Sequence, residues 1–306
     1  RARVAQAARA LGYRADPELG RIMSAVRRAG RFQPHDVVAL LHHPHRFNRY
    51  HRCILAEARR VGPELGLLVH DIDVSGFTSA RGLTRRLQAL GAHGIAVLPL
   101  SQEHPLPTID WAKFSAISFY RKQRDPLLHR VLPDHGKSGY LAFERLVGQG
   151  ARRIGFVTSR LMDAQLGGHP RHGFLRAQDI LGNGGSVPPL VLTAGAELAE
   201  ARAWRRRHRP DAVIVSDDEF IAPVRATGGD LRLLSIGGDP LVDDVDRVFQ
   251  HPEMVARQGL KLLAGLLAQG ERGVPALAST MLIAGEWFAA GEVDGGEGTS
   301  PPMTII

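Results

Sequence analysis

Residues 209–222 read RPDAVIVSDDEFIA, and this stretch decides the predicted fold. Its centre is an unbroken apolar run, 212–215, with charged residues on both sides. A strand with one face in water alternates apolar and polar residues, whereas a strand buried on both faces does not. Strands of the second kind belong to parallel sheets covered by helices on both faces. We therefore predict an α/β protein.

Similar short runs alternate with amphipathic helical segments along the chain. At 306 residues and about 150 residues per domain, the chain is long enough for two such units. We predict two α/β lobes, each a parallel sheet flanked by helices. The predicted strands are 36–41, 66–69, 94–98, 116–119, 153–158, 187–192, 211–216, 231–236 and 247–250. The predicted helices are 49–61, 79–90, 137–148, 170–181, 197–208 and 252–268.

The composition excludes several classes of protein. Hydrophobic residues make up 44% of the chain and charged residues 23%, so most of the chain is not disordered. Cys53 is the one cysteine, which rules out a disulfide scaffold. No run reaches the about 18 apolar residues of a membrane span, and no signal-peptide core follows Arg1. We expect a cytoplasmic protein with no membrane partner.

The positive charge is concentrated at the start of the chain. The net charge is +8, and residues 1–31 contribute +6 of it through eight arginines and two acids. Residues 4–11 have helical apolar spacing, and Asp16-Pro17-Glu18 can begin a second short basic helix. Gly30 to Pro34 form a linker. A basic segment on a nearly neutral body predicts a polyanionic partner.

Catalytic and cofactor motifs are missing from the sequence. It has no G-x-S-x-G, H-E-x-x-H, paired C-x-x-C or G-x-G-x-x-G. Gly136-Lys137-Ser138 resembles the end of a phosphate loop, but Val131 stands where the earlier glycine is required. Four histidines (42, 43, 45 and 51) have no Cys or carboxylate at ligand spacing, so we expect them to line a polar cleft. We predict neither an enzyme nor a metal or cofactor.

Polar side chains follow three consecutive predicted strands of the second lobe. Asp217 and Asp218 follow residues 211–216, Asp239 follows 231–236, and Gln250 closes the third strand. Any one of these acids could be only a helix cap. Together they favour a ligand site, because ligands bind beyond the carboxyl ends of parallel strands. Carboxylates there accept hydrogen bonds from hydroxyls, which favours a sugar or polyol.

These motifs resemble the LacI/GalR family of bacterial transcription regulators. RVAQAARALGYRAD (3–16) is similar to the end of the family's helix-turn-helix headpiece, and LVGQGARRIGFVTS (146–159) to the entry into its second lobe. Residues 209–222 resemble the P-D-A-x-x-x-x-N-D-x-x-A segment, with Asp217 in place of the Asn. LLSIGGDP (233–240) resembles the I-G-F-D-D turn, and residues 247–267 the T-x-x-Q and return helix.

The resemblance implies a two-lobed, periplasmic-binding-protein-like fold crossed three times by the chain. Residues 1–33 would be the remnant of the DNA-binding headpiece and hinge helix, and 34–306 the effector-binding and dimerisation domain. The first lobe would hold about 34–130 and 251–279, and the second about 131–250 and 280–295. The expected partners are operator DNA, a small effector and a second copy. The alternative is a transport-type sugar-binding protein with the same core fold.

The resemblance also assigns site residues. Asp218, Asp239 and Gln250 match effector-cleft positions, and His42, His43, Phe47 and Arg49 would face them from the first lobe. Where the family has an effector-binding Arg, this chain has Pro170 followed by Arg171, which makes Arg171 a candidate.

The same resemblance extends to the DNA-binding segment and to the dimer. Arg21, Arg27 and Arg28 would contact DNA phosphates, and either Ile22 or Met23 would enter the minor groove. The apolar side of the helix at 254–267 is the expected dimer contact.

Overall fold

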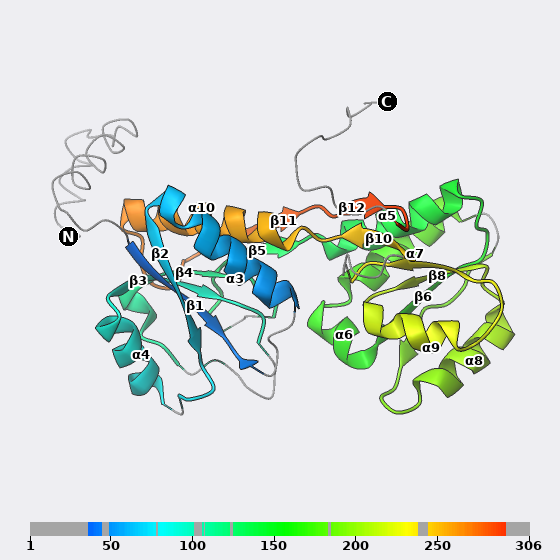
Figure 1. The fold of residues 1–306 in the computed structure, drawn as a ribbon, viewed down its shortest axis with the longest axis horizontal. Coiled ribbons are helices and arrows are strands. Elements are labelled where there is room, and N and C mark those ends of the chain that lie inside the picture. Colours follow the sequence, from blue (N-terminus) through cyan, green and yellow to red (C-terminus); the bar gives the residue numbers. More distant parts are fainter. Residues whose placement is uncertain are drawn as a thin grey trace.

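The computed structural model divides the chain into two α/β lobes (Figure 1). It describes residues 36–44, 49–77, 79–100, 106, 108–122, 125–182, 185–237 and 244–291. The predicted fold class is confirmed, because each lobe contains a six-stranded, mainly parallel sheet with helices on both faces. The headpiece and hinge predicted for 1–33 lie outside the described residues.

The first lobe has the strand order β11-β5-β4-β3-β1-β2, and every neighbouring pair is parallel. Its helices α3 and α10 cover one face of the sheet, and α4 covers the other. The strands are β1 (Asp36–His42), β2 (Leu67–Asp73), β3 (Ala92–Val97), β4 (Ser115–Ser118), β5 (His129–Pro133) and β11 (Thr280–Ile283). The helices are α3 (Arg49–Val61), α4 (Ala80–Ala89) and α10 (Pro252–Gln269), with short 3₁₀ turns η2 (Pro63–Leu65) and η3 (Trp111–Lys113).

The second lobe has the order β12-β10-β9-β8-β6-β7, in which only β12 runs antiparallel to its neighbour. Its strands are β6 (Ile154–Ser159), β7 (Leu190–Leu192), β8 (Ala212–Val215), β9 (Arg232–Ser235), β10 (Asp246–Phe249) and β12 (Glu286–Phe288). Its helices are α5 (His135–Gly148), α6 (Arg160–Gln165), α7 (His169–Leu181), α8 (Glu197–His208) and α9 (Ile221–Arg225), with the 3₁₀ turn η4 (Asp218–Phe220).

The chain crosses between the lobes three times. It passes from β5 into α5, returns from β10 into α10, and passes again from β11 into β12. The first and third crossings fall a few residues later than the sequence predicts, because β5 and β11 pair in the first sheet through Thr280↔Arg130 to Ile283↔Pro133. Residues 131–133 and 280–283 therefore belong to the first lobe.

Three strands escape prediction from the sequence. β5 reads HRVLP and β11 reads TMLI, and both lie at or next to the edge of the sheet. β12 has three residues and pairs with β10 across the crossing. β5 and β12 lack the apolar run of four residues seen in β8, and β11, which has an apolar run, lies at the edge and is fixed by its pairing with β5.

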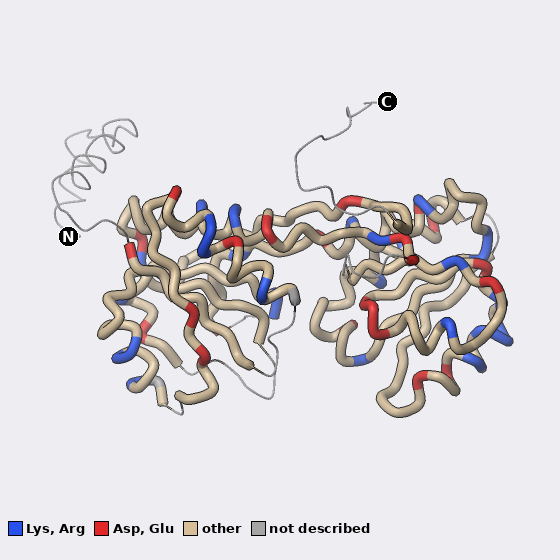
Figure 2. The backbone as a smooth tube through the Cα atoms, viewed as in Figure 1, with Lys and Arg blue, Asp and Glu red and all other residues tan. Residues whose placement is uncertain are grey.

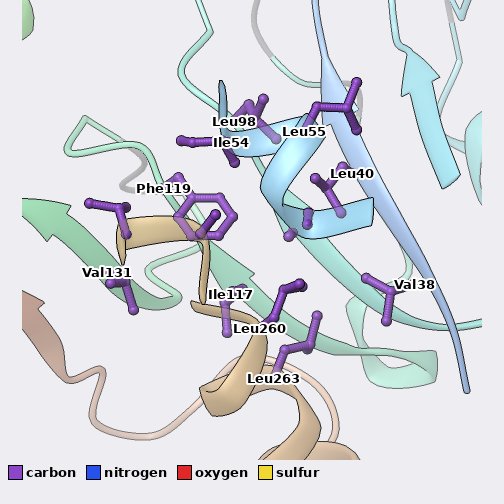
Figure 3. Packing of buried hydrophobic residues seen from close by; sticks show 14 of the residues in the cluster. Val38, Leu40, Ile54, Leu55, Leu98, Ile117, Phe119, Val131, Leu260 and Leu263 are labelled. Carbon is purple, nitrogen blue, oxygen red and sulfur yellow. The ribbon is translucent and has the colours of Figure 1, made fainter. Parts of the chain in front are cut away.

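Helix α10 packs closely on the first sheet. Its apolar side, with Val255, Leu260 and Leu263, lies in the same core as Ile117 and Phe119 (Figure 3). A Cβ on Gly259 would lie 2.2 Å from Phe119 Cε1, so only glycine fits there. The apolar side that the sequence assigns to a dimer is therefore buried within its own lobe, and that assignment is wrong.

Two further glycines allow α5 and α7 of the second lobe to pack closely against each other. A Cβ on Gly139 would lie 2.1 Å from the Pro170 carbonyl oxygen, and one on Gly173 would lie 1.9 Å from that of Gly136. The first turns of the two helices therefore pack backbone to backbone. This close approach places the starts of α5 and α7 side by side next to the first crossing.

In the described part of the chain, every helix is too short or too polar to span a bilayer.

Replacing Gly259 with Ala tests the packing of α10 against Phe119. Alanine favours a helix over glycine by about 1 kcal/mol, but here its methyl group would overlap the Phe119 ring. We expect Gly259→Ala to lower the free energy of unfolding by about 1–3 kcal/mol in urea denaturation, as overpacking does. Gly265→Ala on the same helix is the control, because a Cβ there meets no atom within 4 Å. It should raise stability, and equal effects of the two changes would contradict the packing.

Candidate functional site

The carboxyl ends of both sheets meet at the crossings. β5 ends where the chain enters the second lobe, and β10 ends where it returns to the first. Because β1 to β5 are parallel to one another, as are β6 to β10, all of these strands end toward the opposite lobe. We call the residues at these strand ends, together with the first turns of α3, α5, α7 and α10, the inter-lobe site.

Gln250 is the most buried of the predicted contacts in the second lobe, at 5% exposure. Its Nε2 donates to Ser138 Oγ at 3.2 Å and to the Ile236 carbonyl at 2.9 Å. Its Oε1 is buried and accepts no hydrogen bond from the residues that the structure describes. A buried acceptor without a donor costs about 1–3 kcal/mol. A ligand hydroxyl or amide would satisfy this oxygen.

Asp217 and Asp218 have different environments although they are adjacent. Asp217 caps η4 by accepting from the Glu219 N–H at 3.3 Å. Burial is the main cause that raises its pKa to about 6, and the neighbouring acids add to the effect. Asp218 accepts a hydrogen bond from Ser235 Oγ, which joins the ends of β8 and β9. Both carboxylates therefore already accept hydrogen bonds within the protein. Near pH 6 Asp217 also carries only part of its negative charge.

Arg171 lies in the first turn of α7 and is already paired. Its Nε and Nη2 each donate to a carboxylate oxygen of Asp163 at 3.0 Å, a bidentate ion pair. The pair joins α6 to α7. The ion pair holds the guanidinium against α6 through Nε and Nη2, so only Nη1 lies outside the pair to donate to a ligand.

The histidines at the end of β1 are buried. His42 and His43 lie at the end of the strand, and His42 Nε2 lies 3.7 Å from Asp71 Oδ2. His51 on α3 contacts the Pro99 carbonyl at 2.9 Å through Nε2. The first contact joins the end of β1 to β2, and the second joins α3 to the loop after β3.

Several predicted site residues lie outside the described part. They are Phe47, Asp239 and the DNA-binding residues Arg21, Ile22, Met23, Arg27 and Arg28, and of Arg49 only the backbone at the start of α3 is described.

A second group of residues at the inter-lobe site is absent from the sequence prediction. Arg121 follows β4, and its Nη2 donates to the Pro133 carbonyl at 3.0 Å at the first crossing. A Cβ on Gly167 of the second lobe would lie 3.5 Å from Arg121 Cδ, so this side chain spans the two lobes. Tyr50 on α3 has a buried hydroxyl with no hydrogen-bond partner among the described residues. The sequence feature that could have indicated Arg121 is the basic segment YRKQR (120–124), which comes directly after a predicted buried strand.

Arg121 affects the pKa values of three rings near it, those of Tyr50, His135 and His169. The pKa of His135 is lowered to about 3, first by desolvation and then by Arg121 and His169. Burial raises the pKa of Tyr50, which Arg121 partly offsets and Glu253 reinforces. The site therefore holds two uncharged rings next to a guanidinium.

Two hollows of the surface lie away from the inter-lobe site. One of about 390 Å³ is lined by the starts of β9 and β10, including Arg232 and Asp246. Another of about 630 Å³ is lined by Arg202, Arg205, Arg206 and Arg209 of α8 and the residue after it, where basic residues gather (Figure 2). Both lie at the amino ends of strands. The strand-end site is the better candidate, because parallel α/β sheets bind ligands at their carboxyl ends.

The fold resembles that of solved transcription regulators. A regulatory protein of the LacI family from Chloroflexus aggregans is 19% identical, with 84% of this chain and 98% of that chain covered and a TM-score of 0.64. The transcriptional regulator CelR in complex with cellobiose is 18% identical, with 88% and 89% covered and a TM-score of 0.61. A periplasmic binding protein/LacI transcriptional regulator from Alkaliphilus metalliredigens, in complex with D-xylulofuranose, is 15% identical, with 84% and 98% covered and a TM-score of 0.59.

No family model and no curated protein matches the sequence. At these identities the likeness establishes the fold. The chain has the two-lobed, periplasmic-binding-protein-like fold of LacI-family transcription regulators.

Asp217 gives the site a measurable pH dependence. Its pKa is about 6 in the folded protein against an ordinary 3.8, so the folded state binds this proton more tightly. From about pH 4 to pH 6 its contribution to the free energy of unfolding falls as pH rises, and above about pH 6 its full cost is present. We expect Asp217→Asn, which keeps an acceptor for Glu219 N–H, to be more stable than wild type by about 1–2 kcal/mol at pH 8 and no more stable at pH 4. A difference independent of pH would contradict this assignment.

Proposed function

We propose that the chain is a ligand-responsive DNA-binding transcription regulator whose inter-lobe site binds a small effector, a sugar or polyol. The observation that carries the proposal is the combination of a LacI-family fold with a basic segment ahead of it. Operator DNA as partner implies a cytoplasmic protein.

The effector class is supported from two sides. Two regulators of similar fold have been solved with cellobiose and with D-xylulofuranose. In this chain, Gln250 Oε1 is a buried acceptor that requires a donor. A transport-type binding protein would share the lobes but would have no use for the +6 charge of residues 1–31. Regulation of transcription is therefore favoured over transport, and the similar structures are regulators rather than enzymes.

The mechanism follows from the three crossings. Effector contacts on both lobes would stabilise one relative orientation, and the first lobe would transmit it to the segment at 1–35. In a dimer, two such segments would lie in the DNA minor groove with arginines on phosphates. The effector can change DNA affinity only by its differential affinity for the two orientations, typically about 1–3 kcal/mol.

The DNA contacts are testable through their salt dependence. We expect the triple change Arg21→Ala, Arg27→Ala and Arg28→Ala to weaken binding to all DNA sequences about equally. The slope of log K against log [salt] should become shallower by about 0.9 for each phosphate that the variant no longer neutralises. Fluorescence anisotropy with labelled duplexes, from a pool selected on the purified protein, measures both effects.

The matched control removes the same charge from the second lobe. Arg202, Arg206 and Arg207 of α8 are exposed, so their triple change to Ala alters net charge equally. It should leave the salt slope unchanged. If the two triple variants behave alike, the protein's overall charge rather than the segment at 1–31 attracts DNA.

The edge of the first sheet offers a surface for a second copy. β11 is an edge strand, and its Met281 and Leu282 are 43% and 48% exposed. Leu277, just before it, is 87% exposed, and Leu127 lies exposed before the adjacent β5. Apolar side chains on an unpaired edge favour association. We propose that this edge contributes to a homodimer.

Light scattering tests the dimer. We expect the full chain to have twice the 33.3 kDa chain mass at micromolar concentration. Met281→Lys with Leu282→Lys should shift it toward monomer, because two ammonium groups would be buried at the interface. Ile180→Lys on α7, which is half exposed on the second lobe, is the control and should stay dimeric. A monomeric wild type would remove the dimer from the proposal.

A further inference from the structure

Arg121 is a half-buried cation at the inter-lobe site that lacks a carboxylate partner. Its Nη2 donates to the Pro133 carbonyl, and its own carbonyl accepts from Arg130 Nη1. Its Nε is buried and has no hydrogen-bond partner in the described part of the chain. Asp134 is near enough to influence the guanidinium, but among the described residues no acid forms an ion pair with it. An uncompensated buried charge is costly, so its persistence points to a ligand.

The surroundings of Arg121 leave its positive charge unbalanced. Desolvation lowers its pKa, Arg130 adds to this, and Asp134 opposes it. His135 and His169 have lowered pKa values and stand uncharged beside it. These histidines are also the first residues of α5 and α7, whose amino-terminal turns pack side by side, and the Asp134 carboxylate caps α5 by accepting from Lys137 N–H. Helix starts alone would not define a site, but here they accompany an unpartnered guanidinium.

The described acids of the second lobe do not balance this charge. Asp163 is used by Arg171 in a bidentate pair, and Asp218 accepts from Ser235. Asp217 caps η4 with its carboxylate. Gln250 Oε1, an acceptor, and Tyr50 Oη, which can donate or accept, are also buried at this site without a hydrogen-bond partner among the described residues. Together with Arg121 they call for a ligand that has both hydroxyl donors and an anionic acceptor.

We propose that the effector is an anionic polyhydroxylated molecule, and that Arg121 binds its carboxylate or phosphate while Gln250 Oε1 accepts a hydrogen bond from one of its hydroxyls. The inference rests on the proposed effector role of the inter-lobe site and narrows its ligand class from sugars and polyols to their acids or phosphate esters. Arg121 acts from the first lobe and Gln250 from the second crossing. The ligand would therefore contact both lobes, as an effector that changes their orientation must.

Thermal denaturation with matched ligand pairs tests the charge. D-gluconate is compared with D-glucitol, D-glucose 6-phosphate with D-glucose, and inorganic phosphate with chloride, all at constant ionic strength. We expect at least one anion to raise the Tm of the full chain saturably by about 2 °C or more beyond its neutral or chloride partner. The gluconate and phosphate arms distinguish a carboxylate from a phosphate ligand.

Variants assign the effect to Arg121. Arg121→Met should abolish the preference for the anion and, by removing an uncompensated charge, leave the unliganded Tm equal to or above that of wild type. Arg121→Gln, which can still donate to the Pro133 carbonyl, serves if the first variant folds poorly. The control is Arg130→Met, which removes the neighbouring charge whose guanidinium bonds Thr280 and the Arg121 carbonyl. It should retain the anion response.

The proposal is overturned if no anion stabilises wild type more than its partner, or if the response survives in both Arg121 variants. A lowered Tm of the unliganded Arg121→Met and Arg121→Gln proteins, when wild type also shows no anion response, would make Arg121 a structural brace of the first crossing. Neutral sugars that stabilise wild type and the variants equally would overturn the anionic ligand and leave a regulator with a neutral effector. Operator binding, measured separately, decides the proposed function whatever the charge of the ligand.

Discussion

The buried amide of Gln250 holds together the place where the two lobes meet. Its Nε2 bonds the end of β9 through the Ile236 carbonyl and the first turn of α5 through Ser138 Oγ. Ser138 Oγ in turn donates to the Asp134 carbonyl at 2.9 Å, in the segment of the first crossing. Two of the three crossings are thus joined by one short chain of hydrogen bonds. A ligand that satisfied Gln250 Oε1 would act directly on this chain of hydrogen bonds, which would give the proposed effector a physical route to the orientation of the lobes.

Charge is distributed at this site in a way that composition does not reveal. The sequence shows acids after the strands of the second lobe and histidines after β1, and suggests a polar, acidic cleft. In the structure, Arg171 is paired, Asp218 is hydrogen-bonded, and His135 is neutral. Within the described residues, the Arg121 cation forms no ion pair and keeps a buried Nε without a partner. Most ionic groups described at this site have partners within the protein. Only a few atoms are therefore left to contact a ligand.

Several site residues were predictable and others were not. Asp218 and Gln250 come directly after strands that the hydrophobic pattern predicts, so their place at a strand end could be predicted from the sequence. Arg121 follows the equally clear strand 116–119, but a single arginine in a loop looks like many surface arginines. Tyr50 looks like an ordinary helix residue. Only the crossing of the chain, which places β4, β5 and α7 together, shows that both meet at one site.

The sequence by itself determined the α/β class, most of the helices and central strands, and the basic segment at 1–31, because these depend on local periodicity and composition. The tertiary structure decided which sheet the short strands β5, β11 and β12 join, because their own residues carry too little apolar signal. It also decided that the apolar side of α10 is an interior surface, since the absent side chain of Gly259 lets the helix lie against Phe119. The environments of Arg171, Asp218 and Arg121 were likewise set by long-range contacts, which no local pattern in the sequence encodes.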